Sequence, residues 1–184
     1  MSTPTVLVSV GSDHHPFQRL VDWSDAWAIH RPDVRVVVQH GTARAPQHAE
    51  AHDFLAHAEL QALMSQADAV VVQGGPTAIF EARRTGRLPI VVPRRHALGE
   101  HVDDHQRAFA RFLTTTNQAI ACDGEVSDFL AALDAALDQS AQRRVDPTQD
   151  AREIAASVDR FGELVADLRA RRRLHHGWRR GVRR

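Results

Sequence analysis

The chain has 184 residues, of which 43% are hydrophobic, and its 23 basic residues balance 23 acidic ones. This length suits one domain with an appendage. The sequence contains no apolar run of about 18 residues, so we expect no membrane-spanning helix. The N-terminus lacks a basic segment followed by an apolar one, so we expect no secretory signal. The single Cys122 is typical of a reducing cytoplasm.

Charge is unevenly distributed along the chain. All basic residues are arginines, and eight of them lie in 169–184, which holds no acidic residue. The segment 169–184 therefore has a formal net charge of +8. The rest of the chain, with 15 basic and 23 acidic residues, has a net charge of −8. The split indicates a basic interaction appendage on an acidic domain. We prefer an anionic membrane surface or a protein partner to nucleic acid as its target, and a merely solvated tail remains an alternative.

Strand-like and helix-like segments alternate along the sequence. Short β-branched runs that end at glycine or proline predict strands, and apolar residues at helical spacing predict helices. The expected strands are 5–10, 34–38, 69–73, 88–92 and 119–122. The expected helices are 17–29, 55–64, 76–85, 103–112 and 126–137. Since several strands are continuously apolar, we predict the α/β class, with a Rossmann-like parallel sheet flanked by helices over 1–140. Residues 141–184 are predicted to form an amphipathic helix and an Arg-rich tail.

The segment 70–81 carries the strongest functional signal. An apolar run stops at Gly74 and Gly75, and the proline that follows suits the first position of a helix. Glycines allow close approach of a ligand to the backbone, and the free N–H groups of a helix start suit phosphate. Thr77 and Glu81 lie four residues apart and share one helix face. A plain turn, with Glu81 as a solvated carboxylate paired to a neighbouring arginine, is the alternative interpretation.

Two further loops are expected at the same edge of the sheet, over 11–17 and 93–106. Ligands of open parallel sheets bind beyond the carboxyl ends of the strands, so the three loops together predict one pocket. The candidate binding residues are Gly11, Ser12, Gly74, Gly75, Thr77, Glu81, Arg94, Asp104, His105 and Gln106. For Ser12, a helix cap or turn is an equal alternative.

The pattern Gly-Gly-x-Thr-x-x-x-Glu, followed by a strand, a proline and Asp-Asp-His-Gln, resembles the C-terminal, donor-binding domain of glycosyltransferase family 28. The opening Val-Ser-Val-Gly-Ser…Pro-Phe-x-Arg-Leu-Val is similar to a split branch of that family, whose donor-binding half is a separate small protein. This branch includes the small subunit of the dolichol-linked N-acetylglucosaminyltransferase and bacterial exopolysaccharide counterparts. The likeness covers roughly residues 5–140 and implies one half of a GT-B fold.

The resemblance also implies roles for individual residues. It implies that Glu81 binds the ribose of a UDP-sugar, that the glycine turn and Thr77 lie against the diphosphate, and that 103–106 face the donor sugar. Asp104 stands where asparagine is frequent. Because an ionised carboxylate only accepts hydrogen bonds, we expect Asp104 to meet sugar hydroxyls or a helix end rather than phosphate.

The implied reaction is inverting transfer of a sugar, N-acetylglucosamine or another UDP-linked hexose, without an essential metal or other cofactor. The candidates to stabilise the leaving UDP are His14, His15, Arg94 and Arg95, and the first two are the candidate catalytic residues. A zinc site built from His96, His101, His105 and their neighbouring aspartates lacks a strong ligand signature and is not expected. The remaining histidines at 30, 40, 48, 52 and 57 are expected on the surface or in linkers.

The resemblance implies a partner as well. In two-domain relatives the acceptor is bound mainly by the other half, which a chain of this length does not hold. We therefore expect a separate, membrane-associated acceptor-binding subunit, with the chain held peripherally at the inner face of the cell membrane. The alternatives are a nucleotide-sugar binding or regulatory module without its own catalysis, and a nucleic-acid-associated protein acting through its Arg-rich tail.

Overall fold

The computed structural model describes residues 3–139 and, beyond them, only positions 146, 152, 156, 159, 160, 162 and 163. Most of the predicted C-terminal helix and all of the Arg-rich segment 169–184 lie outside the described residues. In the part of the chain that is described, no helix combines the length and the apolar character needed to cross a membrane.

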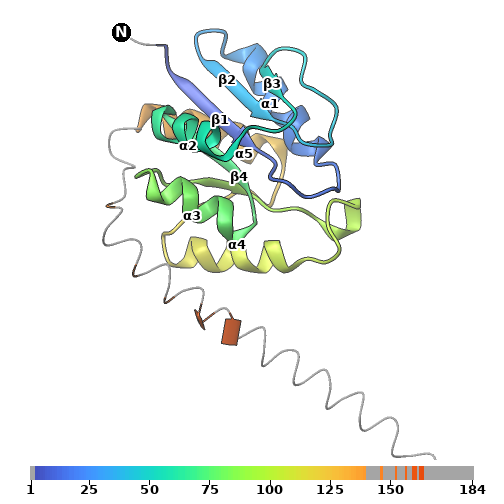
Figure 1. The fold of residues 1–184 in the computed structure, drawn as a ribbon, viewed down its shortest axis with the longest axis vertical. Helices are drawn as coiled ribbons and strands as arrows, with labels where there is room; N and C mark the ends of the chain where they lie inside the picture. Colours follow the sequence, from blue (N-terminus) through green and yellow to red (C-terminus); the bar gives the residue numbers. More distant parts are fainter. Residues whose placement is uncertain are drawn as a thin grey trace, which may run out of the picture. The chain divides into compact units, whose positions relative to one another are not determined.

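Six parallel strands form one sheet in the order β3-β2-β1-β4-β5-β6 (Figure 1). The strands are β1 (Thr5–Ser9), β2 (Arg35–Gln39), β3 (Glu50–His52), β4 (Ala69–Gln73), β5 (Ile90–Val92) and β6 (Ile120–Ala121). The central β1 pairs with β2 and β4, so that Val8 lies opposite both Val38 and Val71. The strand order reverses between β1 and β4, and this switch point is where open parallel sheets bind ligands.

Helices cover both faces of the sheet (Figure 1). They are α1 (Gln18–His30), α2 (His57–Gln66), α3 (Pro76–Arg84), α4 (His105–Thr115) and α5 (Val126–Asp138), with a 3₁₀ turn at His96–Leu98. α1 and α5 pack together on one face, while α2 and α3 pack together on the other, with α4 after β5. The predicted α/β class with a flanked parallel sheet is therefore confirmed.

The hydrophobic core is formed by strands that helices cover on both faces of the sheet. Val70, Val71 and Val72 are all buried, although successive side chains of a strand point to opposite faces. Val71 belongs to the core beneath α1 and α5, which also contains Trp27 and Phe129. Burying an apolar side chain of this size contributes about 1.5–3 kcal/mol, so these runs hold the sheet between its two helical layers.

The strand β3 was not among the predicted elements. Its three residues, Glu50–His52, include two polar ones and carry no strand pattern. The segment becomes a strand by pairing with β2, where Val37 lies opposite Glu50. A strand formed by tertiary pairing leaves little signal in local sequence.

One histidine departs from its expected surface position. The His40 side chain is buried, its Nδ1 lies 2.9 Å from the carbonyl oxygen of Ala43, and its Nε2 lies 3.0 Å from Asp53. Both ring nitrogens therefore have partners, which allows a polar ring to be buried at the end of β2.

Candidate functional site

The predicted strand–turn–helix signal is present as expected. β4 ends at Gln73, Gly75 adopts an extended conformation as the N-cap residue, and α3 begins at Pro76. No side chain caps the N-terminus of α3 within the described residues. Thr77 is exposed in the first turn. The first N–H groups of α3 therefore remain directed at the switch point between β1 and β4, where an anion would meet them.

Glu81 lies one turn further along α3. Its side chain is 19% exposed, and its Oε1 lies 3.6 Å from Nδ1 of His57 at the start of α2. Arg83, one of the two arginines considered as its partner in the alternative interpretation, is buried and donates to the carbonyl of Gln118. Glu81 is thus a partly accessible carboxylate about one turn from the N-terminus of α3, as a ribose-binding role requires.

Gln106 joins the loops that follow β4 and β5. The side chain is buried, and its Oε1 accepts hydrogen bonds from the backbone N–H groups of Gly74 (3.1 Å) and Arg94 (3.2 Å). Its Nε2 donates to Oε1 of Gln73 at 2.8 Å. These bonds hold the two loops in place, and the predicted contact of Gln106 with the ligand stays a prediction.

The glycines of the site lie against the side chains of Gln73 and Gln106. A Cβ on Gly74 would lie 2.8 Å from Cβ of Gln106. A Cβ on Gly75 or on Gly11 would lie 2.7 or 2.6 Å from Nε2 of Gln73. Gly11 also has a φ of +79°, which favours glycine. Close packing against Gln106 is therefore one reason for glycine at position 74, and the predicted approach of a ligand to these glycines stays a prediction.

Arg94 points into the protein. Its side chain has no exposed surface, and its guanidinium donates to the carbonyls of His15 (2.7 Å), Glu100 (2.9 Å) and Val10 (2.9 Å). It also lies over the ring of Phe17. Burial lowers the pKa of Arg94, although nearby carboxylates oppose the shift. The two terminal nitrogens of the guanidinium thus hold the loop backbone, while the contact of Arg94 with the leaving UDP stays a prediction.

Glu100 and Arg95 anchor the same loop. Glu100 accepts two hydrogen bonds from the guanidinium of Arg19 on α1, at 2.9 and 2.8 Å, and one from the backbone N–H of Arg95. The Arg95 guanidinium donates to the carbonyls of Asp123 and Gly124. The loop that precedes α4 is therefore tied to α1 through Arg19 and to the segment after β6 through Arg95.

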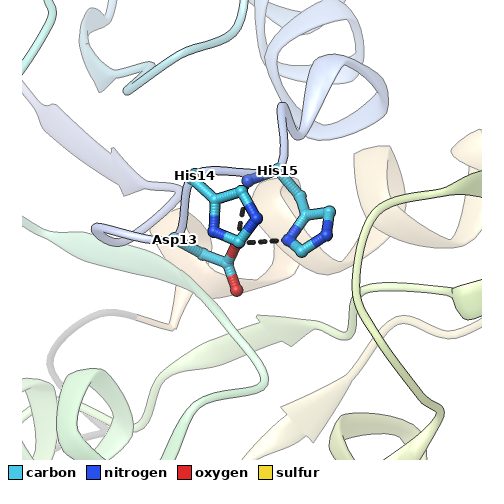
Figure 2. Close-up of side chains that lie close together, drawn as sticks. All are labelled: Asp13, His14 and His15. Carbon is cyan, nitrogen blue, oxygen red and sulfur yellow. Dashed lines mark hydrogen bonds and ion pairs between the residues drawn. The ribbon is translucent and has the colours of Figure 1, made fainter.

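The loop after β1 presents two adjacent imidazoles (Figure 2). The ring centroids of His14 and His15 lie 3.9 Å apart. Oδ1 of Asp13 accepts from the backbone N–H of His15 at 2.8 Å and lies 2.6 Å from its Nδ1. Burial raises the pKa of Asp13, but these hydrogen bonds outweigh it, and the pKa lies below its usual value. His14 is exposed, as is Ser12, so both are accessible to a ligand.

The Asp-Asp-His-Gln element begins α4. Asp103 accepts from the backbone N–H of His105 at 3.1 Å and contacts its Nδ1. Asp104 accepts from the backbone N–H of His96 at 3.1 Å, so its carboxylate supports a turn, in keeping with the expected acceptor role. The exposed Asp104 and His105 face solvent beside the buried Gln106.

Three contributors were not predicted as site residues: Gln73, Asp13 and His101. The side chain of His101 is 14% exposed, and its Nε2 lies 3.3 Å from Oδ2 of Asp13. Burial, with His105 nearby, lowers the pKa of His101. Asp13 directly precedes the candidate histidines His14 and His15, and this adjacency could have predicted Asp13 as a site residue. Nothing local in the sequence predicts that Asp13 meets a histidine 88 positions further along the chain.

The strand order, the glycine turn at the switch point and the start of α3 define a Rossmann-like domain, an open parallel sheet with a ligand-binding edge at its switch point. The family model for the glycosyltransferase family 28 C-terminal domain matches residues 5–160. The chain therefore belongs to this family.

Individual relatives agree with this assignment. A Bordetella petrii protein named UDP-N-acetylglucosamine--N-acetylmuramyl-(pentapeptide) pyrophosphoryl-undecaprenol N-acetylglucosamine transferase is 35% identical over 80 residues, which are 44% of this chain and 21% of that protein. The solved structure of the glycotransferase of kitacinnamycin has a TM-score of 0.62 at 22% identity, over 89% of this chain and 43% of its own. The structure of the spinosyn forosaminyltransferase SpnP has a TM-score of 0.59 at 18% identity, over 90% of this chain and 44% of its own.

These structural likenesses establish a shared fold, the predicted half of a GT-B glycosyltransferase. The chain spans less than half the length of each of these three proteins.

Proposed function

We propose that this chain is the donor-binding, catalytic half of a two-component glycosyltransferase. It would take a sugar from a UDP-sugar, with N-acetylglucosamine as the first candidate, and pass it to a lipid-linked acceptor in cell-surface polysaccharide synthesis. The observation that carries the proposal is the position of Glu81, one turn inside a helix whose N–H groups meet the switch point of the sheet. Diphosphate at the helix start and ribose at Glu81 fit this spacing.

The chemistry follows from charge that develops on the leaving UDP. The N-terminus of α3, beside Gly75 and Thr77, supplies N–H groups and a positive dipole end in front of the diphosphate. His14 and His15 lie on the neighbouring loop and would donate to the same oxygens, with Asp13 orienting His15. The transfer uses no metal ion or other cofactor in the chemical step, and the sugar inverts its configuration.

The acceptor site is proposed to lie on a second polypeptide. The domain matched over 5–160 corresponds to one half of glycosyltransferases that are more than twice as long as this chain. We place the acceptor, and the base that deprotonates its hydroxyl, on a membrane-associated subunit that faces the carboxyl edge of the sheet. The chain would then work in the cytoplasm at the inner face of the membrane.

The proposal is tested by UDP binding with a matched pair of variants. UDP at about 100 times its dissociation constant adds about 2.7 kcal/mol of stability if it binds only the folded state. We expect this thermal shift in the wild type and in Glu59→Ala, an exposed carboxylate of α2, but not in Glu81→Ala. No response of the wild type to UDP or to any other nucleotide would refute the proposal.

A second measurement separates a catalyst from a binding module. Radiolabelled sugar should move from UDP-sugar to membrane lipid only when the chain and its acceptor-binding partner are both present. Nucleotide binding without transfer in any such reconstitution favours the regulatory alternative. Retention on DNA or RNA that disappears on deletion of 169–184 favours the nucleic-acid alternative.

A further inference from the structure

Two loops from distant parts of the chain bring imidazoles and carboxylates into contact at the mouth of the site. The loop after β1 contributes Asp13, the loop before α4 contributes His101 and Asp103, and the first residue of α4 is His105. One nitrogen or oxygen atom from each of the last three residues lies within 4.8 Å of the others. We call these three residues the His101 cluster.

The two nitrogens of His101 have different surroundings. Nε2 lies 3.3 Å from Oδ2 of Asp13, so a proton on Nε2 is held by that carboxylate. Nδ1 then carries a lone pair. This atom is buried and has no hydrogen-bond partner among the described residues. It lies 3.7 Å from Oδ1 of Asp103. Two electron-rich atoms thus face each other across a gap that a cation would bridge.

His105 completes the arrangement. Its Nδ1 contacts the same Oδ1 of Asp103 that faces His101. The rings of His101 and His105 meet edge to face, with centroids 4.8 Å apart. Asp103 and His105 are exposed on their outer sides, so water can fill a remaining coordination position. Two imidazoles, one carboxylate and water make a donor set that suits zinc and neighbouring divalent transition metals.

We propose that the His101 cluster binds one divalent transition metal ion, with Nδ1 of His101, a carboxylate oxygen of Asp103 and Nδ1 of His105 as ligands. Asp13 supports the site from behind by accepting the Nε2 proton of His101. Histidines that bind metal commonly donate their other ring N–H to a carboxylate in this way. The ion fastens the loop before α4 to the loop after β1 and takes no part in the proposed transfer. The inference does not depend on the proposed function.

A proton shared between Asp103 and the two rings is the competing explanation for the short contacts. It needs no metal and predicts no saturable binding. It also gives no reason for a buried Nδ1 of His101 without a partner, because a shared proton on that atom would need the carboxylate closer than 3.7 Å. The two explanations therefore differ in a direct metal titration.

The test is titration of the untagged full-length chain, after treatment with a chelator, with Zn²⁺ by calorimetry and with Co²⁺ by its visible absorption. We expect one saturable equivalent that His101→Ala and Asp103→Asn weaken at least tenfold. Asp13→Asn should weaken it by about 10–100-fold, which is the usual effect of removing such a supporting carboxylate. His30→Ala, an exposed histidine at the end of α1, is the matched control and should bind as the wild type does.

Circular dichroism in metal-free buffer checks that each variant is folded. If His101→Ala does not fold, the metal affinities of His105→Gln and Asp13→Asn are compared with that of His30→Ala. His175 and His176 lie outside the described residues, and any metal that they bind should remain in every variant. The proposal is overturned if neither ion binds saturably, or if the cluster variants bind as tightly as His30→Ala.

Discussion

Gly74 and Gln106 are coupled twice: Oε1 of Gln106 accepts the backbone N–H of Gly74 at 3.1 Å, and a Cβ on Gly74 would lie 2.8 Å from Cβ of Gln106. The glycine turn before α3 thus owes its shape to a side chain on α4, 32 positions away in the sequence. The same amide also holds the backbone N–H of Arg94, so one side chain sets the relative position of two loops.

Replacement of Gln106 by leucine should destabilise the protein by about 3 kcal/mol. The apolar side chain fills a similar volume but leaves the buried N–H groups of Gly74 and Arg94 without their acceptor, and each unpaired group costs about 1–3 kcal/mol. Urea denaturation measures the loss. A leucine variant within about 0.5 kcal/mol of the wild type would show that the two bonds carry little of the free energy of unfolding.

Alanine at the two adjacent glycines should have unequal effects. At Gly74 the new methyl group meets Cβ of Gln106, which cannot move away without shifting α4, and overpacking of this kind costs about 1–3 kcal/mol. At Gly75 it meets the amide end of Gln73, which can rotate aside. Gly74→Ala should therefore have the lower melting temperature, and the reverse order would contradict this packing argument.

Arg94→Lys should destabilise the chain by about 3 kcal/mol despite its conserved charge. One ammonium group cannot reproduce the planar fork that reaches the carbonyls of His15, Glu100 and Val10, so buried acceptors lose their donors. Chemical denaturation provides the measurement, with Arg84→Lys at an exposed position of α3 as the matched control. Equal stability of the two variants would refute the bracing role of Arg94.

Asp25→Asn should cost about 2 kcal/mol at neutral pH. Asp25 accepts the backbone N–H groups of Gln47 (3.0 Å), His48 (2.7 Å) and Ala49 (3.1 Å), which ties the loop before β3 to α1. Burial raises the pKa of Asp25, but the hydrogen bonds from His48 and Gln47 outweigh it, and the pKa of the folded protein is lowered.

The sign of the pH dependence follows from this lowered pKa. The ionised Asp25 stabilises the fold at pH values above the unfolded carboxyl pKa of about 4, and that contribution is lost as the pH falls through the folded value. The difference in free energy of unfolding between the wild type and Asp25→Asn should therefore shrink below about pH 4. A difference that stays constant down to the acid transition would contradict the assignment.

Cys122 should be unreactive in the native protein. The thiol is buried, and burial, with Asp128 nearby, raises its pKa to about 11. At pH 8 only about one thousandth of the thiol is then ionised, and the thiolate is the nucleophile. Ellman's reagent should label one thiol per chain in guanidinium chloride and none on the same timescale without it. Rapid labelling of the folded chain would show that the end of β6 is accessible.

Local sequence was enough for the elements that carry their own signal. The apolar run before Gly74 predicted β4 with its observed ends, and Pro76 predicted the first residue of α3, because a buried strand and a helix start depend on neighbouring residues. The place of Glu81 on α3, four residues after Thr77, was predicted for the same reason. β3 was missed because its pairing with β2, rather than its composition, makes it a strand.

The sequence by itself determined the alternation of strands and helices, the family motifs, and which loops meet at the carboxyl edge of the sheet. The tertiary structure alone decided how the side chains in those loops are used. The side chains of Arg94 and Gln106 are buried, where they form hydrogen bonds with the loop backbone. Asp13 meets His101 because β1 and β5, which flank β4, end at the same edge of one parallel sheet. Periodicity and spacing describe contacts within an element, whereas these pairings depend on how distant loops come together.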